Sequence, residues 1–450
     1  MSHLSVAKFG GTSVANYPAM QSCANIVIAD PNTRVVVLSA SAGVTNLLVA
    51  LANGCEEPER NKLLNEVRQI QENILTALKD DSRVRPKVEA LLANITSLAE
   101  AANLATSLAL TDELISHGEM MSSLIFVEVL RELQIEATWL DVRTIVATNS
   151  HFGKAAPNDE QTRQNCDNLL KPLIERGELV ITQGFIGRDE QGKTTTLGRG
   201  GSDYSAALLA EVLNAQDVLI WTDVAGIYTT DPRIVSNAQR IDTMSFSEAA
   251  EMATFGAKVL HPATLLPAVR SNIPVYVGSS KAPQDGGTWV TRNPQPRPTF
   301  RAIALRRDQT LLTLSSLNML HAQGFLANIF TILAKHKISV DTITTSEVSV
   351  ALTLDKTGSA SSGASLLSEE LLRELSEFCT VKVDVGLSLI ALIGNELHTA
   401  SGVAKRIFET LDAYNIRMIS YGASTNNICL LADSDKADDI VRVLHRSLFE

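Results

Sequence analysis

The segment 193–205 constrains the fold most, because it places a glycine-rich turn between a strand-like stretch and a helix. Its centre reads Leu-Gly-Arg-Gly-Gly-Ser-Asp, and paired glycines permit backbone angles that other residues avoid. Main-chain N–H groups at the start of such a helix form an anion site. We expect Ser202 or Asp203 to cap the helix, Arg199 to pair with a carboxylate or phosphate, and Asp203 to act beside the reacting group. Taken alone, the turn also fits a capped connection with a solvated arginine.

The N-terminus repeats this pattern. A short apolar stretch ends in Lys8 and is followed by two glycines, Thr12 and Ser13. A lysine at the carboxyl end of a strand reaches the crevice where open α/β sheets bind ligands, and its charge suits a phosphoryl group in transfer. The other interpretation is a surface lysine before a turn.

Strands and helices alternate through the first part of the chain. Apolar stretches at 34–41, 179–185 and 218–222 each run into a turn of small or polar residues. Residues 56–105 carry apolar side chains at helical spacing among many charges, which indicates a helical insertion without recognisable chemistry. The alternation predicts an α/β fold with an open, mainly parallel sheet and helices on both faces.

A further helix is expected at 111–133, opened by a Thr-Asp-Glu capping signature. Gly118 inside it costs helix stability and indicates close approach by another element. Glu119 is either a solvated glutamate or the counter-charge for a substrate ammonium. His117 has no second histidine at a metal-binding spacing, so we expect a structural role for it.

Residues 187–194 formally match the phosphate-binding pattern of P-loops. A P-loop opens directly into a helix, whereas three threonines that favour a strand follow here. We therefore expect a hairpin turn. Two later loops are better candidates for a nucleotide: 222–233 carries Tyr228 and Arg233, and 255–262 carries Lys258.

Composition narrows the setting and the partners. A formal net charge of −11 disfavours nucleic acid, and no apolar run approaches the length of a membrane span. Five cysteines lie scattered without paired spacing, which predicts neither a zinc site nor a disulfide framework. We expect a reduced, cytoplasmic setting.

Five segments together resemble aspartate kinases of the amino-acid kinase superfamily. They are Lys8-Phe-Gly-Gly-Thr-Ser13, Ser39-Ala-Ser-Ala-Gly-Val-Thr-Asn46, Thr196-Leu-Gly-Arg-Gly-Gly-Ser-Asp203, residues 221–233, and Phe255-Gly-Ala-Lys-Val-Leu-His-Pro262. The resemblance implies phosphorylation of the β-carboxylate of aspartate by ATP, the first step of lysine, threonine and methionine biosynthesis.

The resemblance also implies roles for individual residues. It implies catalytic roles for Lys8 and Asp203. It implies aspartate binding by Ser39, Thr45, Glu119, Arg199, Gly200, Gly201 and Ser202. It implies ATP binding by Lys8, Gly10, Gly11, Ser13, Thr222, Asp223, Tyr228, Arg233, Lys258 and Val259. Mg²⁺ is expected on the ATP phosphates, with no protein ligand named.

The pattern changes after a proline-rich stretch, 281–299, which we interpret as a linker. We expect a kinase domain at 1–292 and two ferredoxin-like βαββαβ units at 300–386 and 387–450, which resemble ACT domains. The second unit lacks its sixth strand, so we expect it to borrow one, either 302–306 or 381–385.

The first of these units resembles the effector site of lysine-sensitive aspartate kinases. The residues concerned are Met319, Gly324, Phe325, Leu326, Ser339, Val340, Asp341, Ser346 and Glu347. Two carboxylates suit a ligand with two ammonium groups, so lysine is favoured over threonine. Exposed sheet edges predict a homodimer through 300–450, with a tetramer as the larger alternative.

Two other functions stay open at this stage. A kinase for glutamate, acetylglutamate or carbamate would share the nucleotide loops, but it would lack the tandem units. A catalytically silent amino-acid sensor would keep those units, although the intact Lys8 and Asp203 count against it.

Overall fold

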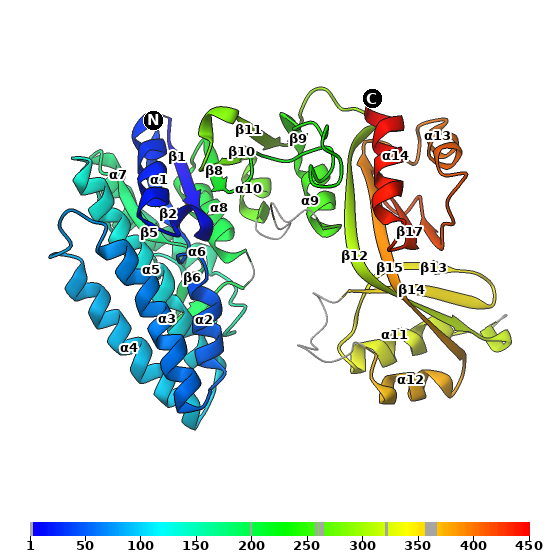
Figure 1. Cartoon of the computed structure of the whole chain (residues 1–450), viewed down its shortest axis with the longest axis horizontal. Helices are drawn as coiled ribbons and strands as arrows, with labels where there is room; N and C mark the ends of the chain where they lie inside the picture. The colour runs from blue at the N-terminus through cyan, green and yellow to red at the C-terminus, as the bar shows by residue number, and fades with distance from the viewer. Residues whose placement is uncertain (1–2, 199, 257–259, 261–264, 320–322, 356–366) are drawn as a thin grey trace. The chain divides into compact units, whose positions relative to one another are not determined.

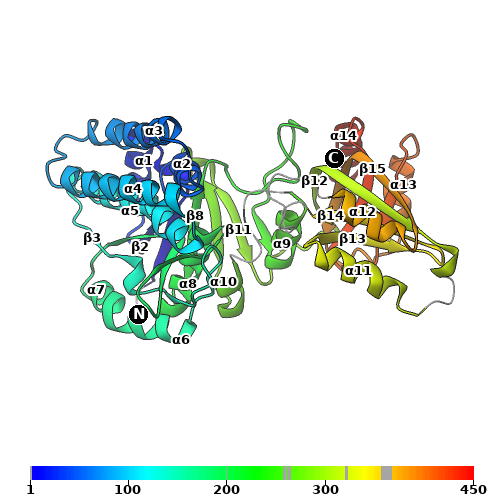
Figure 2. The same cartoon turned by 90° about the horizontal axis from the view of Figure 1, so that it is seen from below.

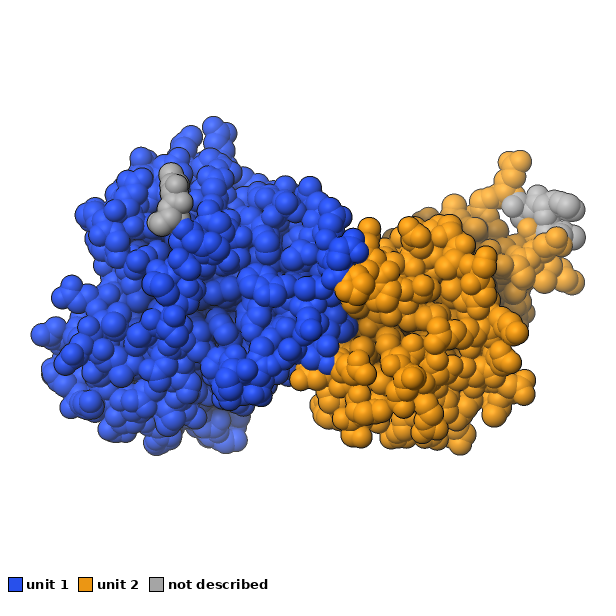
Figure 3. Space-filling view, turned by 90° about the horizontal axis from the view of Figure 1, so that it is seen from above, with its two compact units in different colours: residues 1–227, 240–250, 258–295 blue, residues 228–239, 251–257, 296–450 orange. Residues whose placement is uncertain are grey.

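The computed structural model describes residues 3–198, 200–256, 260, 265–319, 323–355 and 367–450. The chain divides into two compact units (Figure 3). Unit 1 comprises 1–227, 240–250 and 258–295, and unit 2 comprises 228–239, 251–257 and 296–450. Two segments within the predicted kinase range, 228–239 and 251–257, therefore group with unit 2.

Unit 1 is built on an eight-stranded sheet of order β3-β5-β2-β1-β8-β10-β11-β9. The strands are β1 (Ser5–Phe9), β2 (Thr33–Leu38), β3 (Thr138–Trp139), β5 (Val180–Gln183), β8 (Asp217–Thr222), β9 (Thr243–Ser245), β10 (Val275–Ser279) and β11 (Gly287–Thr291). Pairing is parallel from β3 through to β10, and β11 runs antiparallel to β10. The interpretation of 281–299 as a simple linker is thus wrong. The stretch contains β11, which extends the sheet and buries alternate side chains.

Helices cover both faces of this sheet, as predicted (Figure 1). Alternate residues of β1 point to opposite faces. Ala7 and Phe9 belong to the core shared with α1 (Tyr17–Ala29) and α5 (Leu108–Glu132), and the Phe9 and Phe126 ring centroids lie 6.2 Å apart. Lys8, between them, faces α8 (Gly201–Leu213).

The helical insertion comprises α3 (Glu57–Leu75) and α4 (Arg85–Leu104), which pack beside α2 (Val44–Ala52) and α5 (Figure 2). Helix α5 begins three residues before the predicted start at Thr111, because Ser107 is its N-cap and accepts a hydrogen bond from Leu110 N. The short helices of unit 1 are α6 (Asp159–Asn165), α7 (Lys171–Glu175) and α10 (Leu266–Ser271), and α9 (Phe246–Thr254) begins in unit 1 and ends in unit 2.

A second, three-stranded sheet in unit 1 has the order β4-β6-β7. It contains β4 (Ala147–Thr148), β6 (Ile186–Asp189) and β7 (Thr194–Thr196). The pair β6 and β7 is antiparallel, so the P-loop-like stretch 187–194 is a hairpin, as expected.

Unit 2 contains a six-stranded antiparallel sheet of order β13-β14-β12-β15-β17-β16. Its strands are β12 (Phe300–Ser315), β13 (Ser339–Thr345), β14 (Ser349–Asp355), β15 (Thr380–Gly394), β16 (Met418–Ser420) and β17 (Asn427–Asp433). Helices α11 (Phe325–Lys335) and α12 (Glu369–Ser376) pack on one half of the sheet, and α13 (Val403–Thr410) and α14 (Ala437–Phe449) on the other.

The two long strands, β12 and β15, are each shared between both halves of this sheet. Residues 311–315 of β12 pair with β14 in the first half, while 302–306 pair with 389–393 of β15 in the second. The borrowed strand is therefore 302–306, the first of the two alternatives. Only the second half needs chain from outside its own stretch: the first runs without a break from 311 to 384, and the second takes 302–306 from the segment before it.

No described helix is long and apolar enough to cross a membrane.

Candidate active site

Lys8 and Asp203 form an ion pair with 2.6 Å between Lys8 Nζ and Asp203 Oδ1. The side chains are 11% and 14% exposed, so both charges are largely removed from water. Lys8 lies on β1, a central strand, and Asp203 lies in the first turn of α8. Removing two charges from water is costly unless they pair, which explains the short contact. The structure brings together the two residues for which catalytic roles are predicted.

The glycine turn before α8 differs in detail from the prediction. The helix begins at Gly201 with Gly200 as its N-cap, at φ 73°, and no side chain caps it. Ser202 and Asp203 are therefore not caps but lie in the first turn, where Asp203 is free to face Lys8. The left-handed conformation at the N-cap is one that glycine adopts without strain. Arg199 lies outside the described residues.

The turn after β1 interlocks with the turn after β2. Phe9 O accepts a hydrogen bond from Ser39 N at 3.2 Å, and Gly11 O accepts one from Ala42 N at 3.1 Å. A Cβ at Gly11 would stand 2.8 Å from Ala40 O, so only glycine fits this approach. Thr45 follows in the first turn of α2. The predicted Gly10–Gly11 cradle and the predicted aspartate-binding turn thus form one surface at the carboxyl ends of β1 and β2.

Glu119 is buried in the middle of α5, with 3% of its surface exposed. The backbone of Ala40 favours the ionised form of the Glu119 carboxylate, and Oε2 has no hydrogen-bond partner among the described residues. Burial raises the pKa of Glu119 from 4.5 to about 8. No described residue supplies a counter-charge to this buried carboxyl, which suits a site that binds a cationic group.

Gly118 explains how Glu119 reaches this turn. A Cβ at Gly118 would lie 2.7 Å from the Cβ of Ala40, so the glycine lets α5 approach the β2–α2 turn. The neighbouring His117 places Nδ1 2.8 Å from Glu113 O, and burial lowers its pKa, consistent with the structural role expected for it. Ser122 makes a second contact between α5 and the β2–α2 turn, because its Oγ donates a hydrogen bond to Ser39 O at 2.7 Å.

Sequence reasoning missed the residues that pack against the other side of the α8 N-terminus. Phe185 has a φ of 72°, which is rare for a bulky residue. The main-chain N–H of Phe185 donates a hydrogen bond to Ser205 Oγ at 2.9 Å. A Cβ at Gly201 would lie 2.6 Å from the Phe185 ring. The adjacent Gly184 lies so close to Ser202 that a Cβ would come within 2.6 Å of Ser202 Cβ. Nothing in the sequence distinguishes this phenylalanine from one in an ordinary turn.

Part of the predicted nucleotide site lies beside this surface. Ser13 Oγ and Ser280 Oγ are 2.7 Å apart, and Ser280 Oγ also donates to Thr222 O. Gly10 N donates to Trp221 O, which brings the glycine turn to the end of β8. Asp223 is exposed and accepts a hydrogen bond from Thr222 Oγ1 at 3.2 Å. Ser280 is an addition that the sequence did not predict.

The remaining predicted nucleotide ligands belong to unit 2 or lie outside the described residues. Tyr228 and Arg233 fall in unit 2. Arg233, with its side chain 89% exposed, pairs with Asp231 at 2.7 Å. Lys258 and Val259 lie outside the described residues.

The predicted effector residues lie in unit 2, on and around β13. Val340 and Met319 pack against the core of that half of the sheet, and Phe325 is buried at the start of α11. Asp341 forms an ion pair with Arg306 at 2.8 Å, with side chains 11% and 15% exposed. Ser339, Gly324, Leu326, Ser346 and Glu347 are half-buried or exposed. Ser316 N donates to Val348 O, which joins the segment before Met319 to the β13–β14 turn.

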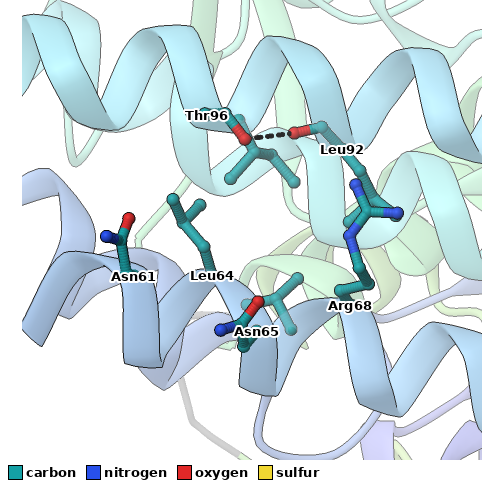
Figure 4. A pocket seen from close by; sticks show the side chains of 8 residues that line it. Asn61, Leu64, Asn65, Arg68, Leu92 and Thr96 are labelled. Carbon is teal, nitrogen blue, oxygen red and sulfur yellow. Dashed lines mark hydrogen bonds between the residues drawn. The ribbon is translucent and has the colours of Figure 1, made fainter. Parts of the chain in front are cut away.

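A separate cavity of about 300 Å³ lies between α3 and α4 (Figure 4). It is lined by Asn61, Leu64, Asn65, Val67, Arg68, Leu92, Ile95 and Thr96. No predicted site residue is among them. Within the described part of the chain, no cluster of three or more His, Cys, Asp or Glu side chains could hold a metal ion.

Comparison with known proteins identifies the family. The amino acid kinase family model matches residues 3–279, and an ACT domain model matches 390–448. Lysine-sensitive aspartokinase 3 of Escherichia coli (strain K12) is 62% identical over 450 residues, covering all of both chains. The chain belongs to the aspartokinases. The resemblance found in the sequence is thereby confirmed, and so is the assignment as a kinase.

Other aspartokinases and solved structures agree with this assignment. Chloroplastic aspartokinase 3 of Arabidopsis thaliana is 34% identical, with 99% of this chain and 81% of the relative covered. E. coli aspartokinase III in complex with aspartate and ADP superposes with a TM-score of 0.89 at 61% identity, and its complex with lysine and aspartate with 0.88. Each covers 100% of both chains, which confirms the predicted combination of an amino-acid kinase fold with ACT units.

Proposed function

We propose that this aspartokinase transfers the γ-phosphoryl group of ATP to the β-carboxylate of aspartate and is inhibited by lysine. The observation that carries the proposal is the buried Lys8–Asp203 pair, placed where two glycine turns and the buried Glu119 carboxyl meet. The relatives support it: the E. coli enzyme has been crystallised with aspartate and ADP, and with lysine and aspartate.

Each group has a task that its environment suits. Phosphoryl transfer requires positioning and positive charge around the moving group more than covalent chemistry. Lys8 supplies that charge, and Asp203, 2.6 Å away, holds the ammonium in place. Glu119 receives the substrate ammonium, and Arg199 receives a substrate carboxylate. The N–H groups of the Gly200–Gly201 turn and of Gly10–Gly11 then serve the anionic groups of aspartate and ATP.

Mg²⁺ is proposed as the partner of the ATP phosphates. This ion keeps several water ligands and binds through one or two carboxylates together with substrate phosphates. The carboxylate of Asp203 is engaged by Lys8, so we assign the ion chiefly to phosphate oxygens and name no protein ligand. Bound there, Mg²⁺ neutralises charge on the phosphates.

Lysine is proposed to bind at the β13 surface of unit 2 between two copies of the chain. Asp341 is the third residue of β13, and Glu347 follows two residues after its end. Six residues of extended chain span up to about 20 Å, farther than the two ammonium groups of one lysine. Both carboxylates can then serve one lysine if they come from different subunits. This supports a homodimer through the ACT units, and five cysteines without disulfide partners are consistent with the cytoplasm.

Turnover with aspartate, glutamate and acetylglutamate, measured in parallel, tests the proposal. Hydroxylamine traps the acyl phosphate, so product is measured directly rather than as ATP loss. We expect product with aspartate only, and less of it when lysine is added. Product with glutamate or acetylglutamate instead would assign the other kinase activity. Lysine binding without product from any of the three would make the protein a silent sensor.

A further inference from the structure

Asp112 is a buried carboxylate that takes no part in the mechanism above. It lies in the first turns of α5 with 1% of its surface exposed. Gly153 N donates to both of its oxygens, at 3.0 and 2.9 Å. Thr196 donates twice, from N to Oδ2 and from Oγ1 to Oδ1, each at 2.8 Å. All partners are donors, which is the arrangement that an ionised carboxylate requires.

Gly153 and Thr196 belong to two different segments. By hydrogen bonding to both, Asp112 links the two segments to each other and to α5. Thr196 ends β7, and Gly153 begins the stretch that runs beside it. Ala155 N donates to Thr196 O at 2.8 Å, and a Cβ on Gly198 would stand 3.4 Å from Gly153 O. Gly198 immediately precedes Arg199 and the turn that opens α8. Asp112 therefore anchors the chain on which the anion-binding turn is built.

The same helix carries the other half of the substrate site. Glu119 follows Asp112 by seven residues, which is close to two helical turns and places both side chains on one face of α5. One face of α5 thus presents the proposed partner of the substrate ammonium and the anchor of the turn that bears Arg199. The position of the segment before α8 relative to Glu119 is then set by this helix.

We propose that Asp112 is a positioning residue for aspartate, because it fixes the Gly198–Ser202 turn relative to Glu119. The inference rests on the proposed aspartate kinase activity and adds a residue that does not touch the substrate. Shifting the turn misplaces the groups that receive aspartate while leaving Lys8 and the nucleotide loops in place. The signature is a raised KM for aspartate with little change in kcat or in the KM for ATP.

A merely structural role would give a different result, and Asp189 provides the matched control. Asp189 is also buried, at 5% exposure, and lies in the same small sheet. It accepts hydrogen bonds from Gln191 N, Lys193 N and Ser150 Oγ. These bonds close the turn end of the β6–β7 hairpin, at the opposite end from Thr196 and the segment that leads to α8. Asp112→Ala and Asp189→Ala therefore delete similar hydrogen-bonding groups, one beside the substrate turn and one away from it.

The experiment measures steady-state kinetics of the full-length wild type and variants, with thermal melting to show that each is folded. Asp112→Ala should raise the KM for aspartate about tenfold or more and change kcat by less than about threefold. Asp112→Asn should recover most of the loss, because one amide oxygen still accepts from both backbone N–H groups. Asp189→Ala should leave the KM for aspartate unchanged. If Asp112→Ala does not fold, Asp112→Glu keeps the carboxylate but displaces the turn, and should raise the same KM.

Two outcomes overturn the inference. One is an unchanged KM for aspartate in every folded Asp112 variant. The other is an equal rise in Asp189→Ala, which would show a general effect of loosening this sheet. Wild-type protein that makes no acyl phosphate from aspartate would instead refute the proposed function, so the two failures are distinguishable.

Discussion

Lys8 and Asp203 are brought within 2.6 Å of one another by two different elements, the central strand β1 and the first turn of helix α8. Both side chains are largely buried, and the two residues lie far apart in the sequence. The pair marks the point where the carboxyl ends of β1 and β8 meet the N-terminus of α8. An ammonium held there by one carboxylate is positioned before any substrate arrives, which is the condition for electrostatic catalysis.

Aspartate binding should release a proton near neutral pH. Burial raises the pKa of Glu119 to about 8, so this carboxyl is mostly protonated in the free protein at pH 7. The substrate ammonium favours the ionised form and expels the proton. Calorimetric titrations in buffers of different ionisation enthalpy should show close to one proton released at pH 7 and fewer at pH 9. Heats independent of the buffer at pH 7 would rule out this role.

Glu119→Gln should stabilise the unliganded protein more strongly as the pH rises. Between pH 4.5 and about 8 the folded Glu119 keeps a proton that the unfolded chain has released, so wild-type stability is lost as the pH rises through this window. Glutamine does not titrate. The gain should be absent near pH 4.5 and reach on the order of a few kcal/mol at pH 8. Urea unfolding of both proteins at pH 5, 6.5 and 8 tests this, and a difference that does not vary with pH would contradict it.

Gly118→Ala should destabilise unit 1 and weaken aspartate binding together. The added methyl carbon would lie 2.7 Å from the Cβ of Ala40, and no side-chain rotation can separate the two atoms. Such overpacking costs about 1–3 kcal/mol. The double variant Gly118→Ala with Ala40→Gly removes the opposing atom and should recover most of the stability, measured by urea unfolding. No recovery in the double variant would show that the helix approach is limited elsewhere.

Glu347→Ala should reduce inhibition by lysine and leave turnover without lysine nearly unchanged. Glu347 is exposed at the β13–β14 turn of unit 2, whereas the kinase sheet belongs to unit 1. Loss of an effector contact lowers the affinity for lysine. Turnover without lysine is nearly unchanged, because the two sites are coupled only through a conformational equilibrium. The readout is the lysine concentration for half inhibition. Glu370→Ala, an exposed carboxylate on α12, is the control and should behave as wild type. Equal lysine binding by wild type and Glu347→Ala would place the effector elsewhere.

The sequence predicted most of the fold because its patterns have local physical causes. The parallel sheet, the helical insertion and the repeated ACT pattern follow from hydrophobic periodicity and glycine turns. The sharing of β12 and β15 between both halves of the unit 2 sheet was only half anticipated, since it depends on long-range pairing. The strand β11 was missed for a similar reason: a short strand among prolines is stabilised by its neighbour β10 rather than by its own sequence.

The site was predictable where a residue carries its own chemistry and not where it acts through geometry. Lys8 and Asp203 stand out by charge beside glycines, and the structure pairs them. Ser202 and Asp203 were expected as caps, but Gly200 takes that position because its left-handed backbone needs no side chain. Phe185 gave no signal, and Asp112 stood out only within a helix-capping signature, since a strained φ and a set of backbone contacts become visible only in three dimensions.

The most direct test of the central claim is acyl phosphate formation from aspartate by wild type and Lys8→Ala, trapped with hydroxylamine at saturating ATP. Because the Lys8 charge is needed most while the phosphoryl group is in transfer, kcat should fall on the order of 100-fold or more, with a much smaller change in the KM for aspartate. Folded Lys8→Ala protein that forms the acyl phosphate as fast as wild type would contradict the account.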